Sequence, residues 1–368
     1  MVAIPYRTFT MRSHDYKVAD VAVGAHELRE PGETILNLRR CSIVALCAFA
    51  IVGLAQQPGD RKQAPASHQP PPSWAFAVDP PASSDAKAKP DDTTPLRVPG
   101  STAAFTQAQV SDLFSVPDWH PEGHPNMPGV VEYGRKPDVF ACGYCHLPKG
   151  EGRPENASVA GLPTEYIVQQ MAAFKSGARK GSEPKLQPLS YMIGVAAHAD
   201  EKEVQVAATY FSGLKPRPWI RVVETASVPK THVAGWMLVV NEPVVREPIG
   251  ERIIETPENL ERAELRDDTS GFIAYVPAGS VKKGKGLVST GGAGKTMPCA
   301  ACHGADLRGK DNAPSIAGRS PSYIVRQLYD MQKGTRTGAR TQLMQAPVAK
   351  LTLDDMVAIA AYLASLRP

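Results

Sequence analysis

Apolar residues recur at helical spacing in two stretches of the chain, and each stretch has a counterpart later in the sequence. One pattern predicts a helix that ends near a glycine, with Tyr166, Ile167, Gln170, Met171 and Phe174 matched by Tyr323, Ile324, Gln327, Leu328 and Met331. The other predicts a closing helix, with Val204, Ala207, Ala208 and Phe211 matched by Met356, Ile359, Ala360 and Leu363. Asp200 with Glu203, and Thr352 with Asp355, form capping pairs at the start of the closing helices. These patterns predict a mainly α fold with two similar helical modules.

The two modules are copies of one repeat. An offset of 157 residues joins the first part of each copy, with Cys142 and Cys299, Gln170 and Gln327, and Arg179 and Arg336 as matched pairs. The offset then falls to 152, because the first copy has a loop five residues longer, and it joins Met192 to Met344 and Tyr210 to Tyr362. Each copy has about 70 to 75 residues, a size that usually requires a cross-link or a cofactor for stability.

The residues between the copies show strand-like rather than helical patterns. Short β-branched runs separated by Pro, Gly and Asn predict strands over 220–225, 236–240, 251–255 and 272–276. Residues 258–268 predict a charged loop or a short helix. We find no Gly-rich phosphate loop, carboxylate pair or metal cluster there. We therefore interpret residues 217–278 as a small β-rich insertion that packs against or separates the modules, and as a structural spacer rather than a ligand-binding module.

The N-terminal part lacks helical periodicity. An uncharged run from Cys41 to Ala55 follows Arg39 and Arg40 and ends on small residues, which is typical of a secretory signal peptide and is short for a membrane-spanning anchor. Residues 56–103 are rich in Pro, Ala, Ser and Lys and predict a disordered tether. The expected division is therefore 1–55 extension with signal peptide or anchor, 56–103 tether, 104–216 first module, 217–278 insertion and 279–368 second module.

Each module contains a Cys-x-x-Cys-His motif, Cys142 to His146 in the first and Cys299 to His303 in the second. In such a motif the two thiols attach a haem covalently and the histidine binds its iron. Zinc sites also begin with Cys-x-x-Cys, but they place a second ligand pair much closer along the chain. A thioredoxin-like redox pair would need a βα context that neither copy has. We expect Cys142, Cys145, Cys299 and Cys302 to hold two haem c groups, with His146 and His303 as axial ligands.

Met192 and Met344 are the candidates for the sixth iron ligand. They occupy matched positions shortly before the closing helix, and a methionine thioether is a common partner of histidine in electron-transferring haems. His198 lies six residues after Met192, where the second copy has Lys350, so either residue can be the ligand in the first module. His120, His124 and His232 are expected on the surface or in loops.

Charge gives little indication of a partner. The chain has 41 basic and 37 acidic side chains, and without residues 1–55 it has 35 and 32. This near-neutral balance argues against nucleic-acid binding. All four cysteines outside the signal-like run belong to the haem motifs, so none is left for a disulfide.

With these motifs, the chain resembles the class I cytochrome c family, in particular its two-haem periplasmic members of the cytochrome c4 type. The resemblance covers Cys142 to Pro216 and about Ser280 to Pro368, and it includes the final aromatic-bearing helix and a first helix over 281–288. The family places a proline carbonyl on the axial histidine, which Pro314 fits, whereas the first copy has Ala157. The insertion and the tether depart from the family pattern.

This resemblance implies an exported bacterial dihaem cytochrome, in the periplasm or anchored to a membrane, in which two His/Met-ligated haems pass single electrons. Its donor would be a respiratory complex or a dehydrogenase, and its acceptor a terminal oxidase or another redox protein. We expect an electron carrier rather than an enzyme. Two alternatives stay open: a haem enzyme of peroxidase or thiosulfate-oxidising type with a labile sixth ligand, and a cytochrome subunit of a larger oxidoreductase.

Overall fold

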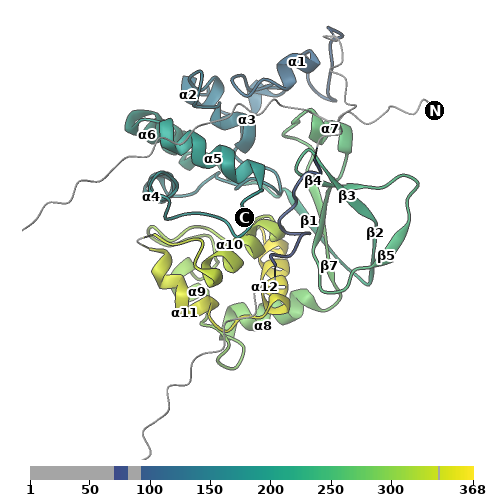
Figure 1. Cartoon of the computed structure of the whole chain (residues 1–368), viewed down its shortest axis with the longest axis vertical. Coiled ribbons are helices and arrows are strands. Elements are labelled where there is room, and N and C mark those ends of the chain that lie inside the picture. The colour runs from purple at the N-terminus through teal and green to yellow at the C-terminus, as the bar shows by residue number, and fades with distance from the viewer. Residues whose placement is uncertain (1–69, 82–92, 339) are drawn as a thin grey trace, which may run out of the picture. The chain divides into compact units, whose positions relative to one another are not determined.

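The computed structural model describes residues 70–81, 93–338 and 340–368. The expected signal or anchor segment within 1–55 lies outside this part of the chain. Among the described helices, none combines the length and the apolar character needed to cross a membrane. The described residues belong to one compact unit, so the division at residues 104, 217 and 279 remains our prediction (Figure 1).

The first module is a set of helices around the first Cys-x-x-Cys-His motif. Its elements are α1 (Gln107–Val110), η1 (Pro121–Gly123), α2 (Gly129–Glu132), α3 (Cys142–His146), α4 (Thr164–Lys175), α5 (Gln187–His198) and α6 (Glu201–Ser212). The two predicted helices are α4 and α6. At the start of α6 the backbone N–H of Glu203 donates to Asp200 Oδ1 at 2.8 Å, and the Asp200 N–H donates to Glu203 Oε2 at 2.9 Å, which confirms the predicted cap.

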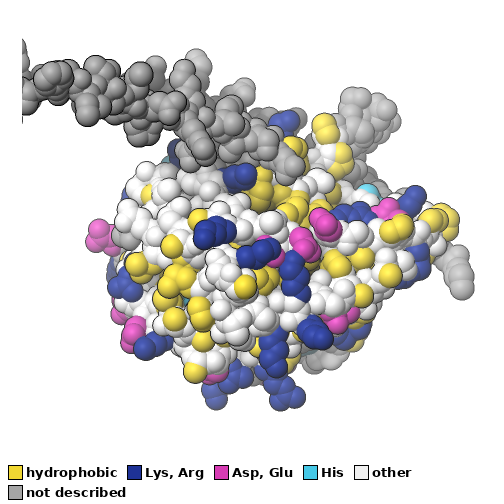
Figure 2. All heavy atoms as spheres, turned by 90° about the horizontal axis from the view of Figure 1, so that it is seen from below, with side chains coloured by type: hydrophobic (Ala, Val, Ile, Leu, Met, Phe, Trp, Pro, Cys, Tyr) yellow, Lys and Arg dark blue, Asp and Glu magenta, His cyan; other side chains and the backbone are white. Residues whose placement is uncertain are grey.

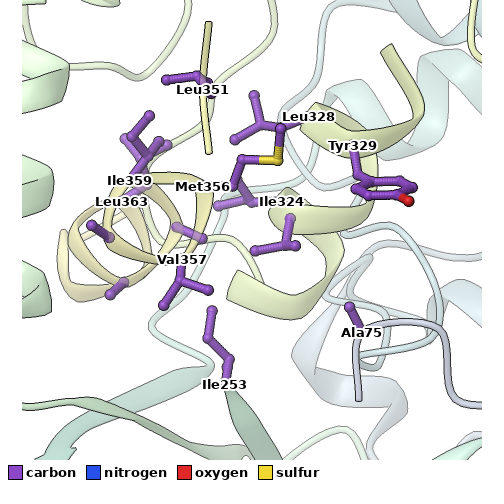
Figure 3. Close-up of a cluster of buried hydrophobic side chains, with 14 of the residues drawn as sticks. Ala75, Ile253, Ile324, Leu328, Tyr329, Leu351, Met356, Val357, Ile359 and Leu363 are labelled. Carbon is purple, nitrogen blue, oxygen red and sulfur yellow. The ribbon is translucent and has the colours of Figure 1, made fainter. Parts of the chain in front are cut away.

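The second module repeats this plan and holds the largest core. Its elements are α8 (Ser280–Thr290), α9 (Ala300–His303), α10 (Pro321–Lys333), η2 (Thr341–Met344), α11 (Gln345–Val348) and α12 (Leu353–Ser365). The apolar positions predicted for the closing helix are buried in this core, and Figure 3 shows Met356, Ile359 and Leu363 on the helix that faces α10. Thr352 and Asp355 form the capping box of α12.

The insertion contains three small sheets. Its elements are β1 (Ile220–Thr225), β2 (Ser227–Pro229), β3 (Thr231–Ala234), β4 (Met237–Val240), β5 (Arg246–Pro248), β6 (Ile254–Pro257), α7 (Leu260–Glu264) and β7 (Phe272–Pro277). Strand β7 lies between β1, which is parallel to it, and β6, which is antiparallel, while β2 pairs with β5 and β3 with β4.

The observed strands differ from the pattern at two points. The strand expected over 236–240 begins one residue later, because Gly235 and Trp236 both have positive φ and form the two-residue turn of the β3–β4 hairpin. The strand expected over 251–255 lies at Ile254–Pro257. Strands β2, β3 and β5 were not predicted, since they have only three or four residues and little alternation.

The structure contradicts a wholly disordered tether over 56–103. Ala75 and Phe76 are 1% and 3% exposed and pack in the core of the second module, where the Phe76 ring lies 5.7 Å from that of Tyr329. The Arg326 guanidinium donates to the Ala75 carbonyl at 2.7 Å, and Val98 is also buried. An apolar segment inside a Pro-rich stretch gives no local sign of a partner more than 200 residues away.

Helices α8 and α12 cross at a glycine. A Cβ on Gly284 would lie 1.9 Å from the Ala358 carbonyl oxygen and 2.8 Å from Tyr362 Cβ, so the two backbones approach too closely for any side chain. Gly286, on the same helix, has nothing within 4 Å of such a Cβ.

We therefore expect Gly284→Ala to lower the free energy of unfolding by about 1–3 kcal/mol, as overpacking does. The matched control Gly286→Ala should raise it by about 0.5–1 kcal/mol, because alanine favours a helix over glycine. Urea unfolding followed by circular dichroism measures both. Equal effects of the two variants would contradict the close crossing.

Candidate haem-binding sites

The two Cys-x-x-Cys-His motifs form short helical turns at matched places. In α3 the Cys142 and Cys145 thiols stand three residues apart, on one side of the turn, and His146 ends the helix. Cys299 caps α9, which ends at His303. None of these four thiols forms a disulfide, and burial raises the pKa of Cys142 to about 12 and that of Cys299 to about 11. These surroundings are apolar and suit a thioether to a haem better than a thiolate.

Each candidate axial histidine is oriented by one backbone carbonyl. His146 Nδ1 lies 2.8 Å from the Ala157 oxygen, and His303 Nδ1 lies 2.8 Å from the Pro314 oxygen. A carbonyl only accepts, so Nδ1 carries the proton and Nε2 keeps a lone pair for a metal. The first module makes this contact despite having alanine in place of proline, because the contact uses the main chain.

Burial keeps both imidazoles neutral. It lowers the pKa of His146 and of His303, while the carbonyl on Nδ1 opposes the shift in both. At His146 the positive charge of Arg179 adds to the lowering of the pKa. A neutral imidazole with a fixed tautomer is the form that binds iron.

The two candidate methionines lie in different local structures. Met344 ends η2, is half-buried and packs against the core of the second module. Met192 lies in the middle of α5, a helix that the apolar pattern did not predict. Met344 is followed by α11, a single turn that contains Pro347, whereas α5 has Pro188 in its first turn, where proline is tolerated, and continues to His198.

His198, the alternative ligand, is turned toward its own helix. Its side chain is exposed, and Nδ1 lies 2.9 Å from the Gly194 carbonyl one turn earlier. The Arg135 guanidinium donates to the His198 carbonyl and pairs with Glu203 at 2.7 Å, which holds this end of α5 at the surface.

The modules contact each other directly, so the insertion does not separate them. Arg179 donates to Tyr323 OH at 2.9 Å and to Gln327 Oε1 at 3.1 Å. In the opposite direction, Arg336 donates hydrogen bonds to Tyr166 OH at 3.0 Å and to Gln170 Oε1 at 2.9 Å. The two arginines also pair through their backbones in an antiparallel bridge. All six residues are repeat partners in the 157-residue offset, so the contact follows an approximate two-fold symmetry.

This junction contains cations without anionic partners. Arg179, Arg319 and Arg336 are 8%, 6% and 7% exposed, and in the described part of the chain none forms an ion pair with a carboxylate. The Nε atoms of Arg319 and Arg336 are buried without any hydrogen-bond partner. Burial lowers the pKa of Arg319 to about 10. An uncompensated buried charge is costly, so an anion bound at this junction would stabilise it.

Propionate carboxylates of bound haem would supply such anions, and the residues present therefore fit the group. Sequence reasoning identified the thiols, histidines and methionines but assigned no role to these arginines. The signal was present in the repeat, because Arg179 and Arg336 are matched in both copies beside Gln170 and Gln327.

The insertion also contacts the first haem motif. The Arg266 guanidinium carbon lies 3.7 Å from the Tyr144 ring centroid, and the same group donates to the Tyr144 carbonyl at 3.1 Å. From the other side Arg153 donates to the carbonyls of Ala263 and Gly235 at 3.0 and 3.2 Å. The insertion therefore packs on α3 and is more than a spacer.

One cluster with metal-binding residue types lies beside this contact. His120, Asp267 and Asp268 place their ligand atoms within 4.8 Å of one another. His120 lies in a loop, as expected, but is buried. Asp267 already faces Arg262 at 2.7 Å and Asp268 faces Lys149 at 3.1 Å. These ion pairs account for both acids, and we assign no metal to the cluster.

The chain is similar in sequence to known c-type cytochromes. A family model for cytochrome c matches residues 281–367. Cytochrome c4 of Pseudomonas aeruginosa is 36% identical over 230 residues, which cover 61% of this chain and 83% of that protein. A thiosulfate dehydrogenase electron acceptor from Thiomonas intermedia is 26% identical over 234 residues, 62% of this chain and 80% of that protein. The structure of reduced recombinant cytochrome c4 from Pseudomonas stutzeri aligns with 61% of this chain and 93% of its own at 20% identity, with a TM-score of 0.41.

Proposed function

This chain belongs to the class I cytochromes c, in the dihaem cytochrome c4-like group, and from this membership we propose that it moves single electrons between a dehydrogenase and a terminal acceptor. It carries two covalently bound haem c groups, and we propose that a histidine and a methionine ligate the iron of each. The protein is a c-type cytochrome electron carrier. The ligands, the partners and a periplasmic location are parts of the proposal.

The observation that carries it is the matched histidine geometry. Both Nδ1–carbonyl distances are 2.8 Å, and both histidines follow two thiols on a short helical turn. This supports two iron sites of the same construction, with Cys142 and Cys145 on one haem and Cys299 and Cys302 on the other.

Methionine ligation in both modules completes the proposal. Met344 lies at the end of η2 and is half-buried, while Met192 lies one and a half turns before His198 on α5. The exposed position of His198 and its contact with the Gly194 carbonyl favour Met192. Two strong axial ligands leave no open coordination position, so a carrier fits better than a peroxidase-type enzyme.

Bound haem iron supplies reversible one-electron chemistry, and the chain sets its conditions. The thiols would fix each haem, and the carbonyls on Nδ1 hold the histidine orientation. Arg179, Arg319 and Arg336 would neutralise propionates at the junction, where the two modules meet. Neutralised propionates and thioether ligands both favour ferrous iron and raise the potential.

A dehydrogenase is the proposed donor. One relative is named as the electron acceptor of thiosulfate dehydrogenase, and this chain covers 80% of that protein. A sulfur-oxidising dehydrogenase is therefore the class of donor that we propose to test first.

The ligand assignment predicts the spectra of three variants. Met192→Leu and Met344→Leu should each remove about half of the thioether-to-iron absorption band of the oxidised protein and lower one potential, because each haem loses a thioether. His198→Ala should leave the band and both potentials unchanged. Redox titration with optical spectra measures all three. A full band in Met192→Leu, or carbon monoxide binding to the reduced native protein, would contradict two His/Met haems.

The arginine junction predicts a second effect on potential. Arg179→Gln removes a buried positive charge near the first haem and should lower a potential by tens of millivolts, where about 59 mV is a tenfold change for one electron. Arg336→Gln should act in the same direction. Lys175→Gln, which removes an exposed charge at the end of α4, is the control and should have a much smaller effect. Equal shifts in Arg179→Gln and Lys175→Gln would show that the junction does not hold propionates.

A further inference from the structure

The two modules have opposite charge, which the overall balance conceals. Residues 279–368 contain 13 basic and 5 acidic side chains, with no glutamate among them. Residues 104–216 contain 10 basic and 12 acidic side chains, and residues 217–278 contain 7 and 10. The second module is therefore strongly positive, whereas the first module and the insertion are both slightly negative.

The modules also differ in the solvent exposure of one pair of matched positions that hold large apolar side chains. In the second module these are Met297, two residues before Cys299, and Leu343, beside Met344; their exposed fractions are 50% and 75%. The Thr296 hydroxyl donates to the Pro347 carbonyl at 2.8 Å, which fastens the two segments side by side. An open apolar patch thus adjoins both the haem-attachment turn and the methionine segment.

In the first module the same positions are covered. The offsets of 157 and 152 place Phe140 opposite Met297 and Tyr191 opposite Leu343. Their rings contact each other edge to face at 5.4 Å, and Trp236 of the insertion contacts Tyr191 at 5.8 Å. The side chains of Phe140 and Tyr191 are both partly buried rather than exposed.

A hydrogen-bonded chain fixes this cover. Trp236 Nε1 donates to Gln187 Oε1 at 2.9 Å, and Gln187 Nε2 donates to Tyr191 OH at 2.9 Å. Trp236 lies at the tip of the β3–β4 hairpin, so the insertion places an indole on the face of the first module that corresponds to the open patch of the second.

The rim of the open patch is basic. The segments 291–303 and 340–350 contain Lys295, Arg340 and Lys350 and no acidic residue. Arg340 and Lys350 are exposed, whereas Lys295 pairs with Asp355 at 2.7 Å. Helices α8, α9 and α11 lie toward the lower side of the molecule in Figure 1, and Figure 2 shows the molecule from below. On this face, Lys and Arg side chains lie next to exposed apolar side chains.

We infer that the insertion closes the docking face of the first haem module, and that the open face of the second module, centred on Met297 and Leu343, binds an acidic redox protein. This inference rests on the proposed electron-carrier function. A small apolar centre within a charged rim fits a transient redox complex, in which complementary charge steers encounter and the apolar contact is brief. The partner would present Asp and Glu around its own cofactor.

The test uses the full-length dihaem protein and an acidic blue copper protein as the oxidant probe, with stopped-flow measurement of electron transfer. Arg340→Glu/Lys350→Glu should lower the second-order rate constant about tenfold or more at an ionic strength of about 10 mM, and the difference should shrink strongly at about 0.5 M. The matched control Lys202→Glu/Lys175→Glu reverses two exposed charges on α6 and α4 of the first module and should change the rate less than about twofold. A loss in the control as large as in the test variant, or no loss in the test variant, would overturn the inference.

Two further measurements sharpen the result. Trp236→Ala should uncover the first module and add a second fast phase to oxidation by hexacyanoferrate(III); an unchanged trace would show that the insertion closes nothing. Sedimentation with anionic phosphatidylglycerol vesicles that depended on Arg340 and Lys350 would assign the face to a membrane instead. Each variant is first checked for two haems with unaltered spectra and potentials, so a failure of the proposed ligation is seen separately from a failure of docking.

Discussion

Three buried guanidinium groups hold the two halves of this molecule together, and none of them has a carboxylate partner among the described residues. Arg179 and Arg336 cross between the modules and bind the tyrosine and glutamine of the opposite copy. Arg319 binds the Ser158 and Ala160 carbonyls across the same junction. Neutral acceptors satisfy only part of the hydrogen-bonding capacity of these groups and none of their charge. In the proposed function the propionates of the two haems would supply the missing negative charge, and haem binding would then stabilise the contact between the modules.

Symmetry at the junction does not extend over the whole molecule. Both histidines have the same carbonyl contact, and both closing helices have the same capping box. The methionine segments already differ, since Met192 lies within α5 and Met344 at the end of η2. The insertion enlarges the difference, because its contacts with Tyr144 and Tyr191 involve the first module. Duplicated haem sites can therefore serve different steps of one electron path.

The candidate haem-binding residues could be proposed from the sequence because their chemistry is local. Two thiols and a histidine must lie within one helical turn, and the repeat separates Met192 and Met344 from ordinary core methionines. The burial of Ala75 and Phe76, the course of α5 and the covering role of Trp236 could not be found in this way. Each depends on contacts with residues far away in the chain, and a short apolar segment does not identify its distant partner.

The sequence by itself determined the cofactor chemistry, the duplication and the capped helices. A five-residue motif and a helix cap each depend on a few neighbouring residues, and a repeat is recognised directly from matching residues at a constant offset. Only the tertiary structure decided which groups surround the haem sites. It brought Arg179 and Arg336 together from matched positions 157 residues apart, and it placed Trp236 over the first module while Leu343 stays exposed on the second. Burial of a charge and exposure of an apolar side chain are properties of the packed molecule, so the same residue types acquired their roles only through their neighbours.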